Sequence, residues 1–111
     1  MVKATEPKRL VVYQDAGGRE PFTDWLNGLR DREGRRVVLK RLGRLEHGLY
    51  GDCKPVGDGV SEQRIFFGSG YRVYFGEEDG RIIILLCGGD KDSQKMDIKA
   101  AKAYWKEHKA Q

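Results

Sequence analysis

Residues 60–91 read VSEQRIFFGSGYRVYFGEEDGRIIILLCGGDK, three apolar segments separated by two short turns that contain glycine. β-Branched and aromatic residues dominate each segment, and the glycines at 68, 70, 76 and 80 supply the positive-φ positions that tight hairpins need. The pattern predicts a β-meander of three strands of about six residues each. The third segment is apolar at every position from 82 to 87, which predicts a central strand covered on both faces.

Arginines interrupt the first two of these strands. Arg64 and Arg72 stand in runs that are otherwise good core material. A guanidinium group keeps its charge and is rarely buried unpaired, so both side chains should face a cleft or solvent. One arginine alone would most simply lie on the wet face of an antiparallel sheet. Two on adjacent strands, with Lys91 at the exit of the third, predict a cationic site.

The rest of the chain predicts one further strand and three helices. Residues 10–13 form a short β-type run, and Pro21 begins a helix whose apolar positions recur at helical spacing up to residue 29. Asp31 is a candidate N-cap for a second helix, with a buried stripe of Val38, Leu42, Leu45 and Leu49. Residues 50–59, with one proline and three glycines, are expected to form a loop. A last helix follows Asp92 or Ser93 and has Ile98, Ala101 and Trp105 on one side.

The element order β-α-α-β-β-β-α predicts an α+β fold, a mostly antiparallel four-stranded sheet packed by two N-terminal helices and one C-terminal helix. With 111 residues the chain is expected to be a single domain, 1–111. No apolar run approaches the roughly 20 residues of a membrane span, and residues 1–10 lack the apolar centre of a signal peptide. The expected location is the cytoplasm, with no membrane partner.

The positive charge of the chain is concentrated in one segment. Residues 35–54 carry six basic and two acidic side chains, which accounts for the whole net charge of +4. Within the second predicted helix Arg36, Lys40 and Arg44 recur every four residues and so share a face. This favours a surface that binds a polyanion such as RNA, with Lys54 on the following loop, over a uniformly basic protein. The alternative is an ordinary solvated helix face.

Metal and cofactor chemistry is not expected. Cys53 and Cys87 form no CxxC pair, which argues against a disulfide or a zinc site. Residues Asp90, Asp92 and Asp97 suit helix capping better than metal binding, and neither GxGxxG nor GxxxxGK[ST] occurs. The two histidines, at 47 and 108, fall near predicted helix ends. No cofactor is therefore expected.

Phosphate is the natural partner of the remaining cations. Arginine binds phosphate oxygens through a planar fork, and lysine acts as a point charge. Cations around a scissile RNA phosphate stabilise the negative charge that develops when the ribose 2′-OH attacks, so cleavage needs no metal. Arg64, Arg72 and Lys91 are the candidate catalytic residues, and Lys91 or Lys54 is the candidate acid or base.

Four segments carry a family resemblance: GREPFTDWL at 18–26, KPVGDGVSEQRI at 54–65, FGSGYRVYF at 67–75 and LLCGGDKDSQKMDIKAAKAYW at 85–105. Together they resemble the RelE/ParE superfamily of toxins, and most closely the HigB-like addiction module killer proteins. The resemblance implies a type II toxin, neutralised by a separate antitoxin, often of helix-turn-helix type, and a RelE-like fold. For RelE- and HigB-type members it implies metal-independent cleavage of mRNA in the ribosomal A site.

The resemblance also implies roles for individual residues. Arg72 matches the strand arginine that contacts the scissile phosphate, Arg64 a basic position on the preceding strand, and Lys91 the basic position after the last strand. Lys54 matches only as a loop cation. Several family nucleases have a tyrosine or histidine near the place of residues 90–97, and this chain has neither there.

Two other functions therefore stay open. The chain could be a ParE-like inhibitor of DNA gyrase that cleaves no RNA, which the missing tyrosine or histidine favours. It could also be a non-catalytic module whose basic helix binds a protein or nucleic acid.

Overall fold

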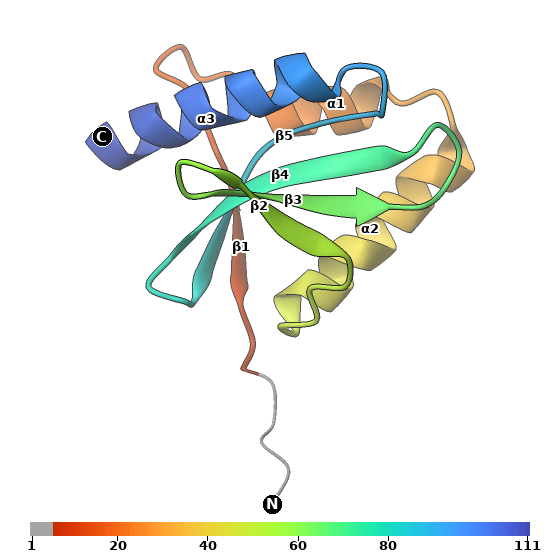
Figure 1. Ribbon diagram of the computed structural model, residues 1–111, viewed down its shortest axis with the longest axis horizontal. Helices are drawn as coiled ribbons and strands as arrows, with labels where there is room; N and C mark the ends of the chain where they lie inside the picture. The colour runs from red at the N-terminus through yellow and green to blue at the C-terminus, as the bar shows by residue number, and fades with distance from the viewer. Residues whose placement is uncertain (1–5) are drawn as a thin grey trace, which may run out of the picture.

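A computed structural model describes residues 6–111 of the chain (Figure 1). Residues 1–5, part of the stretch assessed above for a signal peptide, lie outside the described residues. Over residues 6–111 no helix is long and apolar enough to cross a membrane. The elements are, in order, β1 (Arg9–Val12), α1 (Pro21–Gly28), α2 (Arg32–Glu46), β2 (Cys53–Gly57), β3 (Val60–Ile65), β4 (Tyr71–Glu78), β5 (Ile82–Gly89) and α3 (Gln94–Ala110).

The five strands form one sheet in the order β1-β5-β4-β3-β2. β1 pairs with β5 in parallel, and all other neighbours are antiparallel. The predicted meander is therefore present as β3, β4 and β5. β5 lies between β1 and β4, and its residues 83–89 are all buried, which confirms the central strand that its continuous apolar run predicts.

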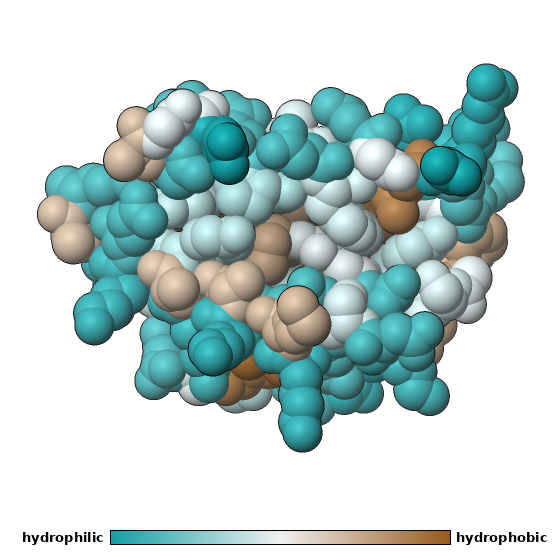
Figure 2. Space-filling model, turned by 90° about the horizontal axis from the view of Figure 1, so that it is seen from above, coloured by the Kyte–Doolittle hydropathy of each residue, from teal (hydrophilic) through white to brown (hydrophobic). Residues whose placement is uncertain are grey.

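Helices cover both faces of the sheet, and each face has its own hydrophobic cluster. Val73 and Phe75 of β4 pack with α1 and α2 residues such as Phe22 and Leu42. Tyr74, which lies between them in sequence and so points to the opposite face, packs with Trp105 of α3 and its neighbours. Figure 1 shows α3 along one side of the sheet and α2 along the other. Seen from the α3 side, the surface is mostly hydrophilic (Figure 2).

The sheet has five strands and not the four predicted, because part of the predicted loop 50–59 is strand β2. Cys53–Gly57 pairs with β3 at the edge of the sheet, with a register shift between Pro55 and Gly57. An edge strand has one side without a ladder, so it tolerates a proline that lacks an N–H donor. Of the three glycines that indicated a loop, Gly51 precedes β2, while Gly57 ends it and Gly59 lies in the turn that follows. All three have positive φ, as does Asp58.

The second helix begins where the sequence predicts and ends before the last residue of its predicted buried stripe. Asp31 is its N-cap, and one carboxylate oxygen accepts the backbone N–H of Gly34 at 3.0 Å. The helix ends at Glu46, and Gly48 follows with φ 76°. The prediction that Leu49 completes the buried stripe is wrong: Leu49 is 50% exposed, since it lies beyond the helix end. The rest of the predicted stripe, Val38, Leu42 and Leu45, is buried.

Glycine in β4 lets α3 lie close to the sheet. A Cβ atom added to Gly76 would overlap the indole ring of Trp105. Trp105 is 5% exposed, so its ring has little freedom to move aside. The close approach of this helix therefore depends on the absence of a side chain at residue 76.

We expect Gly76→Ala to lower the free energy of unfolding by about 1–3 kcal/mol, because the added methyl group overpacks a filled core. The matched control is Gly43→Ala within α2, where an added Cβ atom meets nothing within 4 Å. That change should raise the free energy of unfolding by up to about 1 kcal/mol through helix propensity. Urea denaturation measures the free energy of unfolding of both variants. Equal changes in the two variants would contradict the close packing of Trp105 on Gly76.

Candidate functional site

Arg64 of β3 and Arg72 of β4 stand directly opposite each other in the antiparallel ladder. Their side chains share the face that α3 covers, because Tyr74, two residues along from Arg72, belongs to the α3 cluster. The next position across the sheet is Gly89 at the end of β5, which is paired with Arg72. The two arginines therefore lie beside the point where the chain leaves β5.

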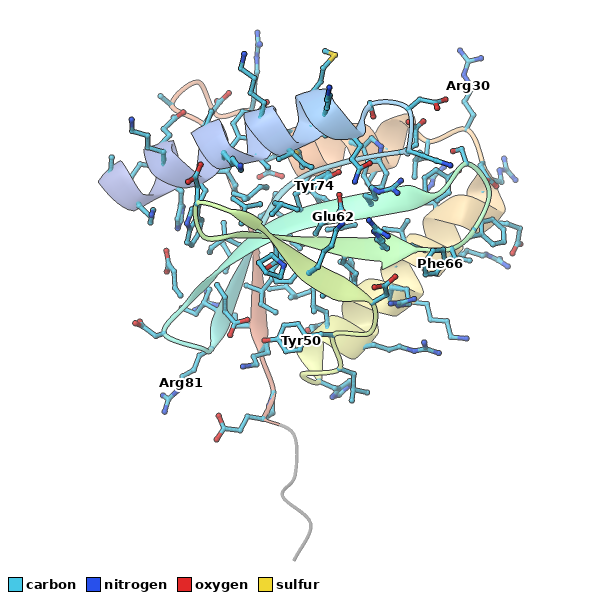
Figure 3. All side chains as sticks on the ribbon, in the orientation of Figure 1. Arg30, Tyr50, Glu62, Phe66, Tyr74 and Arg81 are labelled. Atoms are coloured by element: carbon cyan, nitrogen blue, oxygen red, sulfur yellow. The ribbon has the colours of Figure 1, made fainter. Side chains whose placement is uncertain are left out.

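A buried carboxylate connects the two arginines. Glu62 has no exposed surface; one of its oxygens lies 3.1 Å from Nε of Arg64, and the other lies 3.7 Å from Nε of Arg72. The second oxygen also accepts the hydroxyl of Tyr74 at 3.0 Å and the side-chain amide of Gln94 at 2.9 Å. Figure 3 shows Glu62 and Tyr74 next to each other on the sheet. Gln94 is the first residue of α3, so the network joins β3, β4 and this helix.

The network keeps Glu62 ionised. Burial acts to raise the pKa of Glu62, but the hydrogen bonds from Gln94, Arg64 and Tyr74 and the charge of Arg72 together lower the pKa below its ordinary value. Burial and then Glu62 itself raise the pKa of Tyr74, so this phenol stays protonated and donates to the carboxylate. A negative charge is therefore fixed beneath the two guanidinium groups.

Glu62 offsets one of the two arginine charges and also orients both groups. Nε of Arg64 donates to Glu62, whereas Nε of Arg72 lies at ion-pair distance from Glu62 and makes no hydrogen bond within residues 6–111. Nη1 of Arg72 donates to the carbonyl of Gly70 at 3.0 Å, and within residues 6–111 the two Nη atoms of Arg64 make no hydrogen bond. The Arg64 side chain is 31% exposed and that of Arg72 is 12% exposed. The paired guanidinium groups are held from below, and Arg64 has its outer atoms free for a ligand.

Lys91 joins this pair through the β3–β4 turn. Its backbone N–H donates to the carbonyl of Ser69 at 3.5 Å. A Cβ atom added to Gly70 would lie 3.6 Å from Nη1 of Arg72 and 3.7 Å from Cβ of Lys91. The structure thus brings Arg64, Arg72 and Lys91 together around one turn, with the Lys91 side chain exposed.

Lys54 lies on strand β2 and not on a loop. It is the direct partner of Glu62 in the β2–β3 ladder, so its side chain is on the same face as the arginines. It is exposed. Lys54 therefore extends the cationic side chains across three neighbouring strands.

The predicted RNA-binding residues of α2 lie elsewhere. Arg36, Lys40 and Arg44 are all exposed, and Arg36 pairs with Glu33 at 3.6 Å. Because α2 packs on the sheet face opposite to α3, the body of the sheet separates these residues from Arg64 and Arg72. The structure therefore divides the predicted basic residues into two surfaces, one on each face.

The acidic residues of the β5–α3 connection serve its local structure. Asp90 accepts the backbone N–H groups of Asp92 and Ser93, at 3.0 and 3.2 Å. The Asp97 carboxylate accepts the Ser93 hydroxyl at 2.5 Å and lies over Gly89, where any side chain would overlap it. Burial, and then the charge of Asp90, raise the pKa of Asp97 against the effect of the Ser93 hydrogen bond. Among residues 6–111 no three acidic, histidine or cysteine side chains are grouped to hold a metal ion.

The thiols and imidazoles lie outside the arginine site. Burial raises the pKa of Cys53 to about 11 and that of Cys87 to about 12, so neither is a thiolate at neutral pH. His47 is the C-cap of α2, and His108, in the last turn of α3, lies 2.5 Å from Glu78. Both histidines thus occur at helix ends, as the sequence indicates.

Sequence reasoning missed Glu62. The signal was present, because Glu62 and Arg64 are two residues apart on a predicted strand and so share a face. The sequence did not show that this face is buried, because its burial depends on the first turn of α3, which reaches Glu62.

We expect Glu62→Gln to lower the free energy of unfolding by roughly 2–3 kcal/mol, since it leaves two part-buried arginines without their counterion. The matched control is Glu33→Gln, which removes an exposed ion pair and should change stability by less than about 1 kcal/mol. Chemical denaturation measures both. A Glu62→Gln variant as stable as the wild type would contradict the role of this carboxylate.

The same network predicts a pH dependence. Because the fold lowers the pKa of Glu62, the unfolded chain takes up this proton at a higher pH than the folded chain does. The stabilisation that ionised Glu62 contributes is complete above the ordinary glutamate pKa of about 4.3, and it is lost as the pH falls through the pKa of Glu62 in the folded chain. The stability difference between wild type and Glu62→Gln should therefore narrow below about pH 4; a gap constant with pH would contradict the pKa shift.

Comparison with known proteins identifies one relative by sequence. No family model matches the chain. A protein of Haemophilus influenzae, described as an uncharacterized protein, is 47% identical over 81 residues, which span 73% of this chain and 82% of the relative.

Proposed function

The chain belongs to the same family as the Haemophilus influenzae protein, and we propose that it is the toxin of a type II toxin–antitoxin system. In this proposal it acts in the cytoplasm as a metal-independent endoribonuclease that cuts mRNA on the ribosome and so blocks translation. The proposal includes a RelE-like fold, with β2 as an added edge strand beside the four strands that the sequence predicts.

The observation that carries the proposal is the pair of guanidinium groups, Arg64 and Arg72, held side by side over Glu62. Two adjacent planar forks suit the several oxygens of one phosphate. Glu62 accepts Nε of Arg64, and the carbonyl of Gly70 accepts Nη1 of Arg72, so both side chains lose less freedom when a ligand binds. Such preorganised cations are what a phosphoryl transition state needs, since its negative charge increases during the reaction.

The chemistry proposed is attack of a ribose 2′-OH on the neighbouring phosphorus. The 2′ O–H proton leaves to a base, the new P–O bond forms, and the bond to the 5′ oxygen breaks as that oxygen takes up a proton. Arg64 and Arg72 stabilise the charge on the non-bridging oxygens. Lys91 and Lys54, exposed at two sides of the arginine pair, are the residues proposed to exchange the protons.

The proposed partners follow from the two basic surfaces. The ribosome would present the mRNA, and the basic face of α2, with Arg36, Lys40 and Arg44, would contact RNA from the other side of the sheet. A cognate antitoxin, of helix-turn-helix type in the family that the sequence resembles, would neutralise the toxin. Acidic segments of that antitoxin would suit the exposed cations.

A second candidate function is inhibition of DNA gyrase in the manner of ParE. The state of Tyr74 favours this function. Tyr74 is the tyrosine in the Glu62 network, and its hydroxyl is buried and hydrogen-bonded to Glu62, so it is not free to act as the acid or base of a nuclease. Both histidines occur at helix ends away from this site. A nuclease would then depend on lysines for proton transfer. A third reading, a non-catalytic binding module, would use the basic face of α2 alone.

We expect Arg72→Ala to abolish growth arrest on induced expression, together with the new 5′ ends that mapping of cellular mRNA should detect for the wild type. Arg72→Lys keeps the charge but loses the planar fork, so it should fold and still lose most activity. The control is Arg81→Ala, an exposed arginine on the β4–β5 turn, away from the site (Figure 3).

The outcomes separate the candidate functions. Full toxicity of a folded Arg72→Ala protein would contradict the proposed mechanism. Growth arrest by the wild type without new mRNA ends, and with loss of gyrase supercoiling activity in vitro, would favour the ParE-like function. Lack of any growth phenotype would favour the binding module.

A further inference from the structure

The β3–β4 turn carries an exposed aromatic side chain beside the arginine site. Phe66 is 78% exposed and Phe67 is 36% exposed. Phe66 follows the last residue of β3, two positions after Arg64 (Figure 3). Burying a phenylalanine side chain stabilises a fold by about 1.5–3 kcal/mol, and the exposed Phe66 does not contribute this stabilisation. A single exposed apolar residue is ordinary; the location of this one is what carries meaning.

The turn that presents Phe66 is held in place by the cationic site itself. The carbonyl of Gly70 accepts Nη1 of Arg72, and the carbonyl of Ser69 accepts the backbone N–H of Lys91. Within the turn the N–H of Phe67 donates to Ile65 at 2.9 Å, and that of Gly70 donates to Phe67 at 3.0 Å. The turn that carries Phe66 is therefore hydrogen-bonded to the side chain of Arg72 and to the backbone of Lys91.

The other side of the turn rests on the start of α2. A Cβ atom added to Gly68 would lie 3.4 Å from a carboxylate oxygen of Asp31 and 3.5 Å from the hydroxyl of Tyr71. That hydroxyl donates to Asp31, the N-cap of α2, at 2.9 Å. Gly68 thus lies close to the start of α2, and Gly70 is hydrogen-bonded to Arg72, so both ends of the turn that carries Phe66 adjoin ordered parts of the fold.

We propose that Phe66 is a stacking platform for a base of the RNA strand whose phosphate the two arginines hold. This inference rests on the proposed function and deepens it, because it makes single-stranded RNA with an unstacked base the substrate. Phe66 lies two residues from Arg64, roughly 6–7 Å along an extended chain. That spacing corresponds to about two stacking steps of a nucleic-acid strand at roughly 3.4 Å each.

A base suits this place better than a protein side chain does. Aromatic side chains interleaved with cations are the usual means of binding single-stranded RNA, in which every base offers a π-face. A protein contact of comparable strength would need a surrounding ring of packed residues. Here the neighbours of Phe66 along the turn are Phe67, two glycines and Ser69, and the nearest strand residues on the arginine face are charged.

Binding of a labelled single-stranded 2′-O-methyl oligoribonucleotide, which cannot be cleaved, tests the inference by fluorescence anisotropy. Phe66→Ala should weaken binding by about 5- to 150-fold, the range for loss of one stacked base. Phe66→Tyr and Phe66→Trp keep a π-face and should bind nearly as well as the wild type. The control is Met96→Ala, which removes an apolar side chain of similar exposure, 77%, from α3.

A second oligonucleotide with abasic sites, tested against both protein variants, gives a double-mutant cycle between Phe66 and the base. If Phe66 stacks on a base, the abasic strand should bind the wild type and Phe66→Ala equally, since the pairwise contact is then already absent. Since Phe66 is exposed, Phe66→Ala should leave the thermal unfolding temperature unchanged, so weaker binding cannot be attributed to misfolding.

The results distinguish this inference from the function it rests on. A wild type that binds neither strand would overturn both. A wild type that binds, loses affinity through Arg72→Ala and keeps it through Phe66→Ala would overturn the stacking role alone. Unchanged RNA binding by Phe66→Ala, combined with poorer neutralisation by the antitoxin, would also overturn it and assign Phe66 to a protein interface.

Discussion

The shared carboxylate of Glu62 is the interaction on which the site and part of the fold depend. A fully buried negative charge is costly unless it is paired and hydrogen-bonded, and Glu62 satisfies this with two arginines, a phenol and an amide. These partners come from β3, β4 and α3. The same contacts that compensate Glu62 therefore hold two strands and a helix in register and fix the guanidinium groups of Arg64 and Arg72.

Glycines decide how closely the helices approach this network. Gly89 leaves room for Asp97 and Ser93 of the α3 start on one face of the sheet, and Gly88 leaves room for Trp25 of α1 on the other. Only residues without a Cβ atom permit both approaches at neighbouring positions of one strand. Because α3 can come this close, Gln94 reaches Glu62. The glycine pair at the end of β5 thus contributes to the site through its lack of side chains.

The sheet separates two basic surfaces with different character. On the α3 face, cations from three strands surround a fixed carboxylate, and the turn that carries Phe66 adds an aromatic side chain. On the other face, Arg36, Lys40 and Arg44 of α2 are exposed, and Arg36 pairs with the exposed Glu33. Flexible surface cations give affinity that falls with salt. Constrained guanidinium groups give directional binding of one phosphate.

The sequence by itself determined the mixed α+β class, the meander, the buried central strand, the Asp31 cap, and the adjacency of Arg64 and Arg72, since local periodicity and turn residues encode all of these. Contacts between distant segments decided the rest. Strand β2 exists because β3 offers an edge to residues 53–57, and Glu62 is buried because α3, more than 30 residues later, covers it. A sequence pattern does not show which face of a sheet a distant helix covers. Only the tertiary structure therefore showed that the arginines pair with Glu62 and that the sheet separates them from the basic residues of α2.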